Sequence, residues 1–124
     1  MPGEQLRSEP GTMLYMGDKV GAGCEGCFDC PGCCLRVCAG ESAVYSTYKN
    51  DGAEAAIIGL TPNYPAKIVA LAIDGGSPYM VKGGAYMAEL DNIDISVSFP
   101  GFQACCCGGQ GCIVQHLVSF WCAG

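Results

Sequence analysis

Six of the eleven cysteines in this 124-residue chain fall within fifteen residues, and their thiols are the side chains best able to do chemistry. They are Cys24, Cys27, Cys30, Cys33, Cys34 and Cys38. The first four recur every three residues, a spacing that fits neither one face of a strand nor, beyond two turns, one face of a helix. The pattern therefore predicts a loop that wraps around an ion or is held by cross-links.

Thiolates at this spacing can bind thiophilic metals. The run Cys24-x2-Cys27-x2-Cys30-x3-Cys34 has the spacing of a bacterial-type iron–sulfur site, although Pro31 follows the third cysteine and not the fourth. Four of the six thiolates would equally satisfy tetrahedral zinc. Structural disulfides or free thiols are the third interpretation, and the odd number of cysteines leaves at least one thiol unpaired in any scheme within one chain. The sequence leaves zinc, an iron–sulfur cluster and metal-free thiols open.

A second group, Cys105, Cys106, Cys107 and Cys112, lies in a similar glycine-rich setting. Residues 38–44 align with residues 107–113, and a pair of adjacent cysteines precedes each copy. This alignment predicts two copies of one β-unit, about 11–73 and about 83–124, related by a pseudo-two-fold axis; chance similarity of glycine-rich turns is the alternative. Three consecutive cysteines cannot easily ligate one ion, so the second group is the weaker candidate metal site.

Short runs of strand-forming residues, separated by turn residues, surround both cysteine groups. They predict strands at residues 12–16, 42–48, 53–60, 67–73, 78–81, 85–89, 93–99 and 112–120. The almost wholly apolar segment 67–73 reads as a strand buried on both faces, whereas residues 1–10 read as extended or frayed. No window favours a helix over strands. The pattern predicts a single all-β domain over residues 1–124, a sandwich whose loops carry the cysteines.

Charge and hydropathy exclude several classes of protein. Twelve acidic residues against six scattered basic ones give a net charge of −6, which argues against a nucleic-acid partner. The longest apolar run, 68–73, is far shorter than the ~20 residues of a membrane-spanning helix. No basic segment followed by an apolar one opens the chain, so we expect an intracellular location, in the cytoplasm or in an organelle such as a mitochondrion or plastid.

No arrangement of residues typical of catalysis is present. His116 is the only histidine and is expected on the surface of a strand, and the serines form no nucleophile elbow or triad pattern. We therefore expect no enzymatic activity and no catalytic residues.

Five segments resemble one known family. They are Gly-x-Met-x-Tyr-Met at residues 11–16, Ala-Gly-Glu-Ser at 39–42, Leu-Thr-Pro-Asn-Tyr-Pro-Ala-Lys-Ile-Val at 60–69, Lys-Gly-Gly-Ala-Tyr-Met-Ala at 82–88 and Gly-Gly-x-Gly at 108–111. Their order along the chain is similar to that of the altered inheritance of mitochondria family, which has a TRAP-like β-fold named after the tryptophan RNA-binding attenuation protein. The resemblance implies an all-β duplicated unit without enzymatic activity, in a family with some members linked to the organisation of the mitochondrial inner membrane.

The chain departs from this family in its cysteine-rich loops and in ending well before the family domain normally does. Because the second repeat stops soon after residues 112–120, we expect that strand to form an open, apolar sheet edge. The sequence thus predicts a structural or binding protein, a homo-oligomer or a subunit of a larger complex, with cysteine loops as metal clips or cross-links. The alternative is an electron-transfer protein that holds an iron–sulfur cluster in the loop from Cys24 to Cys38.

Overall fold

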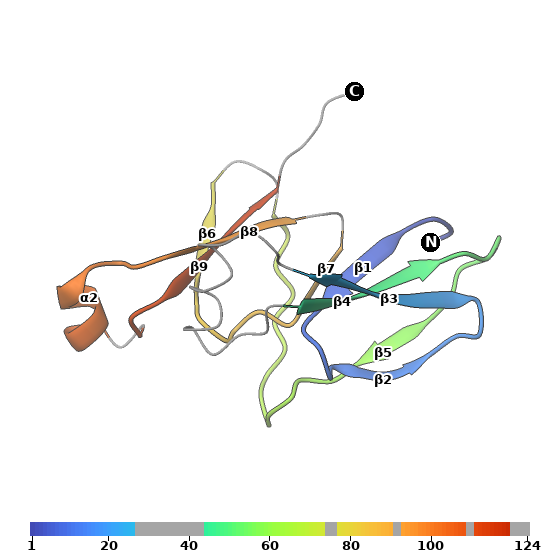
Figure 1. Ribbon diagram of the computed structural model, residues 1–124, viewed down its shortest axis with the longest axis horizontal. Helices are drawn as coiled ribbons and strands as arrows, with labels where there is room; N and C mark the ends of the chain where they lie inside the picture. The colour runs from blue at the N-terminus through green and yellow to red at the C-terminus, as the bar shows by residue number, and fades with distance from the viewer. Residues whose placement is uncertain (27–43, 74–76, 91–92, 109–110, 120–124) are drawn as a thin grey trace. The chain divides into compact units, whose positions relative to one another are not determined.

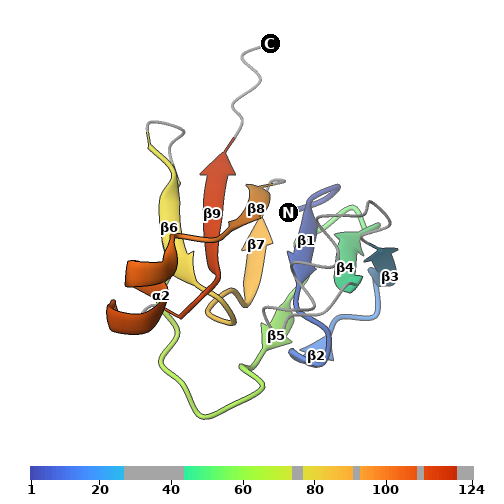
Figure 2. The same cartoon turned by 60° about the vertical axis from the view of Figure 1, so that its left-hand side comes forward.

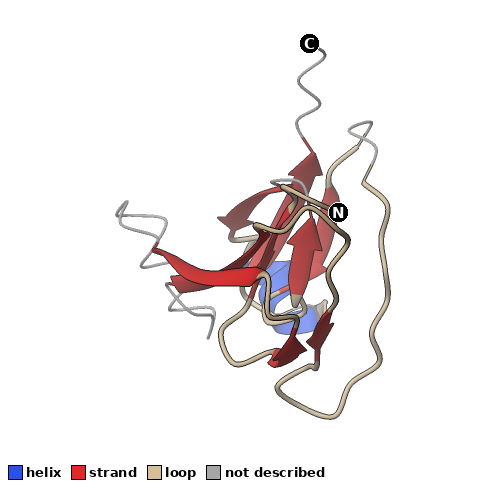
Figure 3. Ribbon diagram, turned by 90° about the vertical axis from the view of Figure 1, so that its right-hand side faces the viewer, coloured by secondary structure: helices blue, strands red, loops and turns tan. Residues whose placement is uncertain are grey.

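The computed structural model describes residues 1–26, 44–73, 77–90, 93–108 and 111–119. The described residues form nine strands and one short helix (Figures 1 and 3), so the predicted all-β class is confirmed. The elements are β1 (Gln5–Ser8), β2 (Met13–Met16), β3 (Val20–Gly26), β4 (Val44–Asn50), β5 (Ile58–Leu60), β6 (Tyr79–Lys82), β7 (Ala88–Leu90), β8 (Ile93–Ser98), α2 (Phe102–Cys107) and β9 (Val114–Ser119).

These elements fall into two compact units. The first contains an antiparallel sheet of order β3-β4-β1-β7 and the two-stranded ribbon β2–β5. The second contains the antiparallel sheet β6-β9-β8, and Figure 2 shows α2 in the connection from β8 to β9.

Residues 1–10 were expected to be extended or frayed, and residues 5–8 are extended in strand β1, which is paired on both sides. It pairs with β4 on one side and with β7 on the other, so that Leu6 faces both Tyr48 and Leu90. Ser8 at its end is fully buried. The four residues of β1 show no clear apolar alternation, and the strand forms because two distant segments satisfy its backbone N–H and C=O groups.

A small polar cluster fills the interior of the first unit where β1 turns toward β2. Gly11, with φ of 84°, provides the left-handed backbone of this turn. The buried hydroxyl of Thr12 lies 3.0 Å from Ser8 Oγ and 2.8 Å from the carbonyl oxygen of Glu9, to which it donates. The turn is therefore held by hydrogen bonds that are shielded from water.

Replacing Thr12 by valine should lower the free energy of unfolding by about 1–2 kcal/mol. Valine keeps the shape of the side chain but removes the hydroxyl that donates to the carbonyl of Glu9, so that the buried cluster loses one hydrogen bond and keeps the one of 3.1 Å from Ser8 Oγ to the same carbonyl. Urea unfolding followed by circular dichroism measures the loss. Thr47→Val, at a half-buried position of β4, is the matched control, and equal stability of the two variants would contradict the expectation.

The second unit is built around β9. This strand pairs with β6 through Tyr79–Lys82 and with β8 over its whole length. Val114, Gln115 and Leu117 are buried. The expectation of an open edge at residues 112–120 is therefore wrong, because β6 and β8 occupy both sides of β9 and take up its backbone hydrogen bonds.

Three strands in each unit share one arrangement. In the first unit β4 lies between β3 and β1, and in the second β9 lies between β8 and β6, with antiparallel pairing throughout. Among the three strands compared in each unit, the one that comes last in the chain is the central one. The duplication and its pseudo-two-fold axis remain predictions.

Two further expectations are wrong. Residues 67–73 form no strand, and Ile68, Val69 and Leu71 are exposed, because no described strand lies beside this segment to bury it. Helix α2 was not expected. It follows the positive-φ Gly101, whose carbonyl accepts a hydrogen bond of 3.0 Å from the amide of Cys105.

Candidate functional site

The structure describes five of the ten cysteines predicted as metal ligands. Cys24 lies on the edge strand β3, opposite Ser46, and its thiol is free and exposed. Cys27, Cys30, Cys33, Cys34 and Cys38 lie outside the described residues. Zinc or an iron–sulfur cluster in the loop from Cys24 to Cys38 therefore stays a prediction.

The second cysteine group is partly oxidised. Cys105, in the last turn of α2, forms a disulfide with Cys112, two residues before β9. Cys106 and Cys107 are free and exposed. A disulfide sulfur does not provide the thiolate that a metal needs, so the predicted role of Cys105 and Cys112 as ligands applies only to a reduced chain. No group of three or more His, Cys, Asp or Glu residues that could hold a metal occurs among the residues that the structure describes.

The histidine on β9 is tied to its neighbouring strand. His116 Nε2 lies 2.7 Å from Ser98 Oγ on β8, and the histidine is half-buried. The two residues are two positions apart in the antiparallel register, where Ser96 faces His116 directly. This contact joins the two strands across the sheet and leaves no nucleophile–base–acid arrangement among the described contacts of the histidine.

A charged row crosses the four-stranded sheet of the first unit. Arg7 on β1 faces Glu89 on β7 and forms an ion pair with it, and the Glu89 side chain is only 3% exposed. The guanidinium also lies 4.7 Å from the ring centroid of Tyr45 and 3.8 Å from the carboxylate of Glu25. Because paired charges and an aromatic face surround the guanidinium, this row connects all four strands of the sheet.

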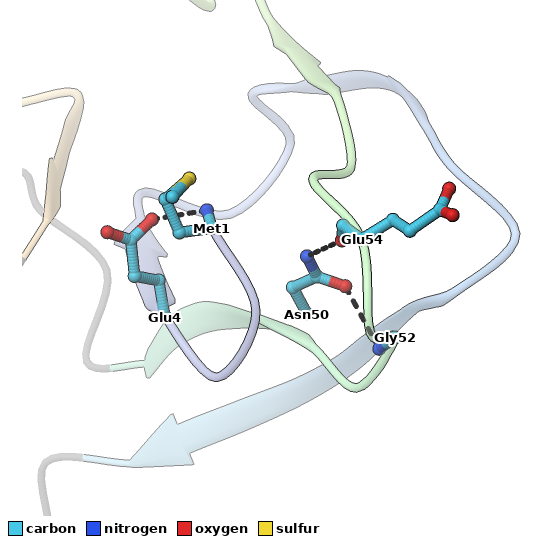
Figure 4. Close-up of polar contacts among 5 residues, drawn as sticks. All are labelled: Met1, Glu4, Asn50, Gly52 and Glu54. Atoms are coloured by element: carbon cyan, nitrogen blue, oxygen red, sulfur yellow. Dashed lines mark hydrogen bonds and ion pairs between the residues drawn. The ribbon is translucent and has the colours of Figure 1, made fainter.

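The first unit also contains an open pocket of about 330 Å³. Leu6, Tyr48 and Leu90 of the large sheet line it on one side, and residues 56–58 line it on the other. The polar residues that line it already have partners. The side chain of Asn50 accepts a hydrogen bond from the amide of Gly52 and donates one to the carbonyl of Glu54 (Figure 4). Glu4 pairs with the amino group of Met1. The pocket lacks a convergent set of reactive groups.

An exposed apolar surface of the first unit lies on β2 and on the residue before β5. We call Met13, Leu14, Tyr15, Met16 and Ile57 the apolar ribbon, and all five are exposed. Leu14 and Ile57 are 66% and 71% exposed. Hydrogen bonds from Gly17 to Ile57 (2.9 Å) and from Thr61 to Thr12 (2.7 Å) extend the pairing beyond both ends of β2.

The geometry of the apolar ribbon is set by a bulge and a glycine. The register shifts between Met13 and Tyr15, which leaves Leu14 as the bulged residue. Tyr15 faces Gly59, and a Cβ added there would meet the tyrosine ring at 2.3 Å. Glycine at 59 thus allows the ring to lie against the backbone of β5 while much of it remains in solvent.

The apolar ribbon is also the uncharged edge of the described sheets. The other edge strands each carry a charge, namely Glu25 on β3, Glu89 on β7, Lys82 on β6 and Asp94 on β8. β2 and β5 carry none, and only β2 is exposed at every residue. Charged residues on an edge discourage pairing with another chain, so β2 is the edge least protected against such pairing.

Together the fold and the surface define an all-β protein with an exposed apolar edge. The sequence model of the family described as mitochondrial biogenesis AIM24 matches residues 1–119. The chain belongs to this family, as the five sequence segments indicated; the TRAP-like detail of the fold stays a prediction.

One solved structure is similar to this chain over most of its length. It is the crystal structure of a protein from Streptococcus pyogenes, with a TM-score of 0.63 and 22% sequence identity. The match covers 96% of this chain and 52% of that protein, so the chain spans about half the length of its structural relative. At this identity the likeness shows the fold alone. We found no match among curated proteins.

Sequence reasoning missed the apolar ribbon as a surface. Residues 13–16 are a continuous apolar run, which looks the same whether both faces of a strand are buried or both are exposed. The absence of charge on this short strand was the one available signal. No helix in the described part of the chain is long and apolar enough to cross a membrane.

Proposed function

We propose that this chain is a non-enzymatic binding protein that acts by assembling with a second copy of itself through the apolar ribbon. The observation that carries the proposal is the exposure of all four residues of β2, an edge strand without a charge. An edge strand presents unpaired N–H and C=O groups to another strand. A two-stranded ribbon is also marginal alone and gains stability from additional strands.

A second copy is the occupant that fits this edge best. In a two-fold symmetric dimer β2 would lie antiparallel to its own copy, so the side chains of β2 must be compatible with one another. Met13, Leu14, Tyr15 and Met16 meet that condition because apolar side chains do not repel one another. The edge strands β3, β6 and β8 carry the exposed charges Glu25, Lys82 and Asp94, which discourage pairing with another strand, and Glu89 on β7 is already paired with Arg7.

Net charge makes this association distinguishable from one held by ion pairs. Each copy carries a formal charge of −6, so two copies repel at low ionic strength. Added salt screens that repulsion while leaving apolar contacts in place. Association through the apolar ribbon should therefore strengthen with salt, whereas association through ion pairs would weaken.

Replacing Leu14 by lysine should weaken self-association at least tenfold, equivalent to about 1.4 kcal/mol. The substitution places a charge on the edge at the bulged residue, where it disturbs the β2–β5 ladder least. Sedimentation equilibrium at two salt concentrations measures the effect, and the thermal melt should not change at concentrations where both chains are monomeric. Phe102→Lys, at a position of α2 that is 78% exposed, is the control and should associate like the wild type.

A wild-type chain that stays monomeric at every concentration and salt level would overturn the proposal. Equal weakening by Leu14→Lys and Phe102→Lys would place the contact elsewhere. The family description refers to mitochondrial biogenesis, which supports the expected intracellular location in an organelle; fractionation of cells that produce the chain tests it.

A further inference from the structure

The segment from α2 to β9 contains four cysteines in two chemical states: three lie on α2 and Cys112 lies just before β9. Cys105 and Cys112 are joined, while Cys106 and Cys107, between them in the sequence, are free and exposed. The two bonded residues differ in their surroundings, because Cys112 is exposed and Cys105 is half-buried on the helix. No charged residue follows Asp94 in the sequence, so no carboxylate adjacent in sequence repels an approaching anion.

We propose that the Cys105–Cys112 disulfide is an exchange site whose substrate is a low-molecular-weight thiol. Exchange requires a thiolate to reach one sulfur of the disulfide, and the accessible sulfur determines which mixed disulfide forms. The exposure difference assigns the attack to Sγ of Cys112. Cys105 is then the leaving group and remains on α2.

The reaction balances without any further oxidant or reductant. The thiolate of the small thiol forms a new S–S bond with Cys112 as the bond between Cys105 and Cys112 breaks, and the Cys105 thiolate takes up the proton that the small thiol lost. A second thiol attacks the mixed disulfide and releases the oxidised small molecule, which leaves Cys112 reduced. The segment from α2 to β9 then carries four thiols, those of Cys105, Cys106, Cys107 and Cys112.

A reduced thiol used as the probe distinguishes reaction at the disulfide from the labelling of free cysteines. A reduced thiol attaches first where it breaks an existing disulfide, so Cys106 and Cys107 acquire it only later, by attack on the mixed disulfide or on the oxidised small molecule that the second step releases. The earliest time points therefore report the site of attack. The full chain is treated anaerobically with reduced glutathione, quenched at intervals with iodoacetamide and digested with chymotrypsin. Cleavage after Phe102 and Leu117 yields peptide 103–117, which contains all four cysteines.

The expected product carries glutathione on Cys112 and carbamidomethyl groups on Cys105, Cys106 and Cys107. It should exceed the isomer with glutathione on Cys105 at least tenfold in the folded chain, and by much less in guanidinium, where both sulfurs are accessible. Cys112→Ser should abolish the adduct, whereas Cys106→Ser and Cys107→Ser should retain it. Attachment mainly to Cys105, or no glutathione on this peptide while the folded chain is exposed to thiol, would overturn the proposal.

Discussion

Replacing Arg7 by methionine should lower the free energy of unfolding by about 3 kcal/mol or more, which is the largest effect that we expect from one substitution. The Glu89 carboxylate faces Arg7 across β1 and β7 and is 3% exposed, whereas the Arg7 side chain is 19% exposed. Methionine retains an apolar stem but removes the charge, which leaves a buried carboxylate without its cation. Breaking a buried pair in this way typically costs about 3–5 kcal/mol.

Two further variants separate this effect from a general disturbance of the sheet. Glu25 lies 3.8 Å from the same guanidinium but is 55% exposed, so Glu25→Gln should change stability by less than about 1 kcal/mol. The double variant Arg7→Met/Glu89→Leu removes both charges and should recover much of the loss. Guanidinium unfolding followed by circular dichroism gives the three values. A double variant less stable than Arg7→Met would show that packing, and not the uncompensated charge, causes the loss.

Replacing Cys112 by serine should lower the free energy of unfolding by about 2 kcal/mol. The disulfide joins residues separated by 7 positions, and closing so short a loop restricts the unfolded chain by about that amount in the loop-entropy description. The substitution also releases the end of α2 from the start of β9. A six-residue helix is marginal without tertiary support.

Unfolding in the presence of reductant tests whether loss of the disulfide causes the lower stability of Cys112→Ser. Cys106→Ser, at a free and exposed thiol, should unfold like the wild type in the absence of reductant. Adding reductant should lower the unfolding midpoint of the wild type to that of Cys112→Ser and leave the variant itself unchanged. If reductant destabilises Cys112→Ser as much as the wild type, a different disulfide accounts for the stability.

Local sequence patterns located several strands. In β8, Ile93, Ile95 and Val97 alternate with polar residues, and the structure places these three in a more protected environment than Asp94 and Ser96. The turn expected after β4 is present, held by the contact between Asn50 and Gly52. Such features could be predicted because period-two alternation and turn-forming side chains act between near neighbours.

Strand pairing could not be predicted in the same way. The strands predicted at residues 42–48 and 53–60 are consecutive in the sequence, yet β4 pairs with β1 and β3, and β5 pairs with β2. Polar β1 became an inner strand, whereas the apolar residues 67–73 stayed exposed. In each instance the outcome depends on which distant segment supplies the hydrogen bonds, and no pattern within the segment contains that information.

The same distinction, between what local sequence predicts and what distant segments decide, applies to the candidate sites. Cysteine types and spacing by themselves predicted where thiol chemistry could occur, and strand-forming residues with dispersed glycines determined the all-β class. Only the tertiary structure decided that Cys105 pairs with Cys112, that Arg7 meets Glu89, and that β2 is an exposed, uncharged edge. Residue type sets what a side chain can do, but burial and pairing are collective properties of segments far apart in the sequence.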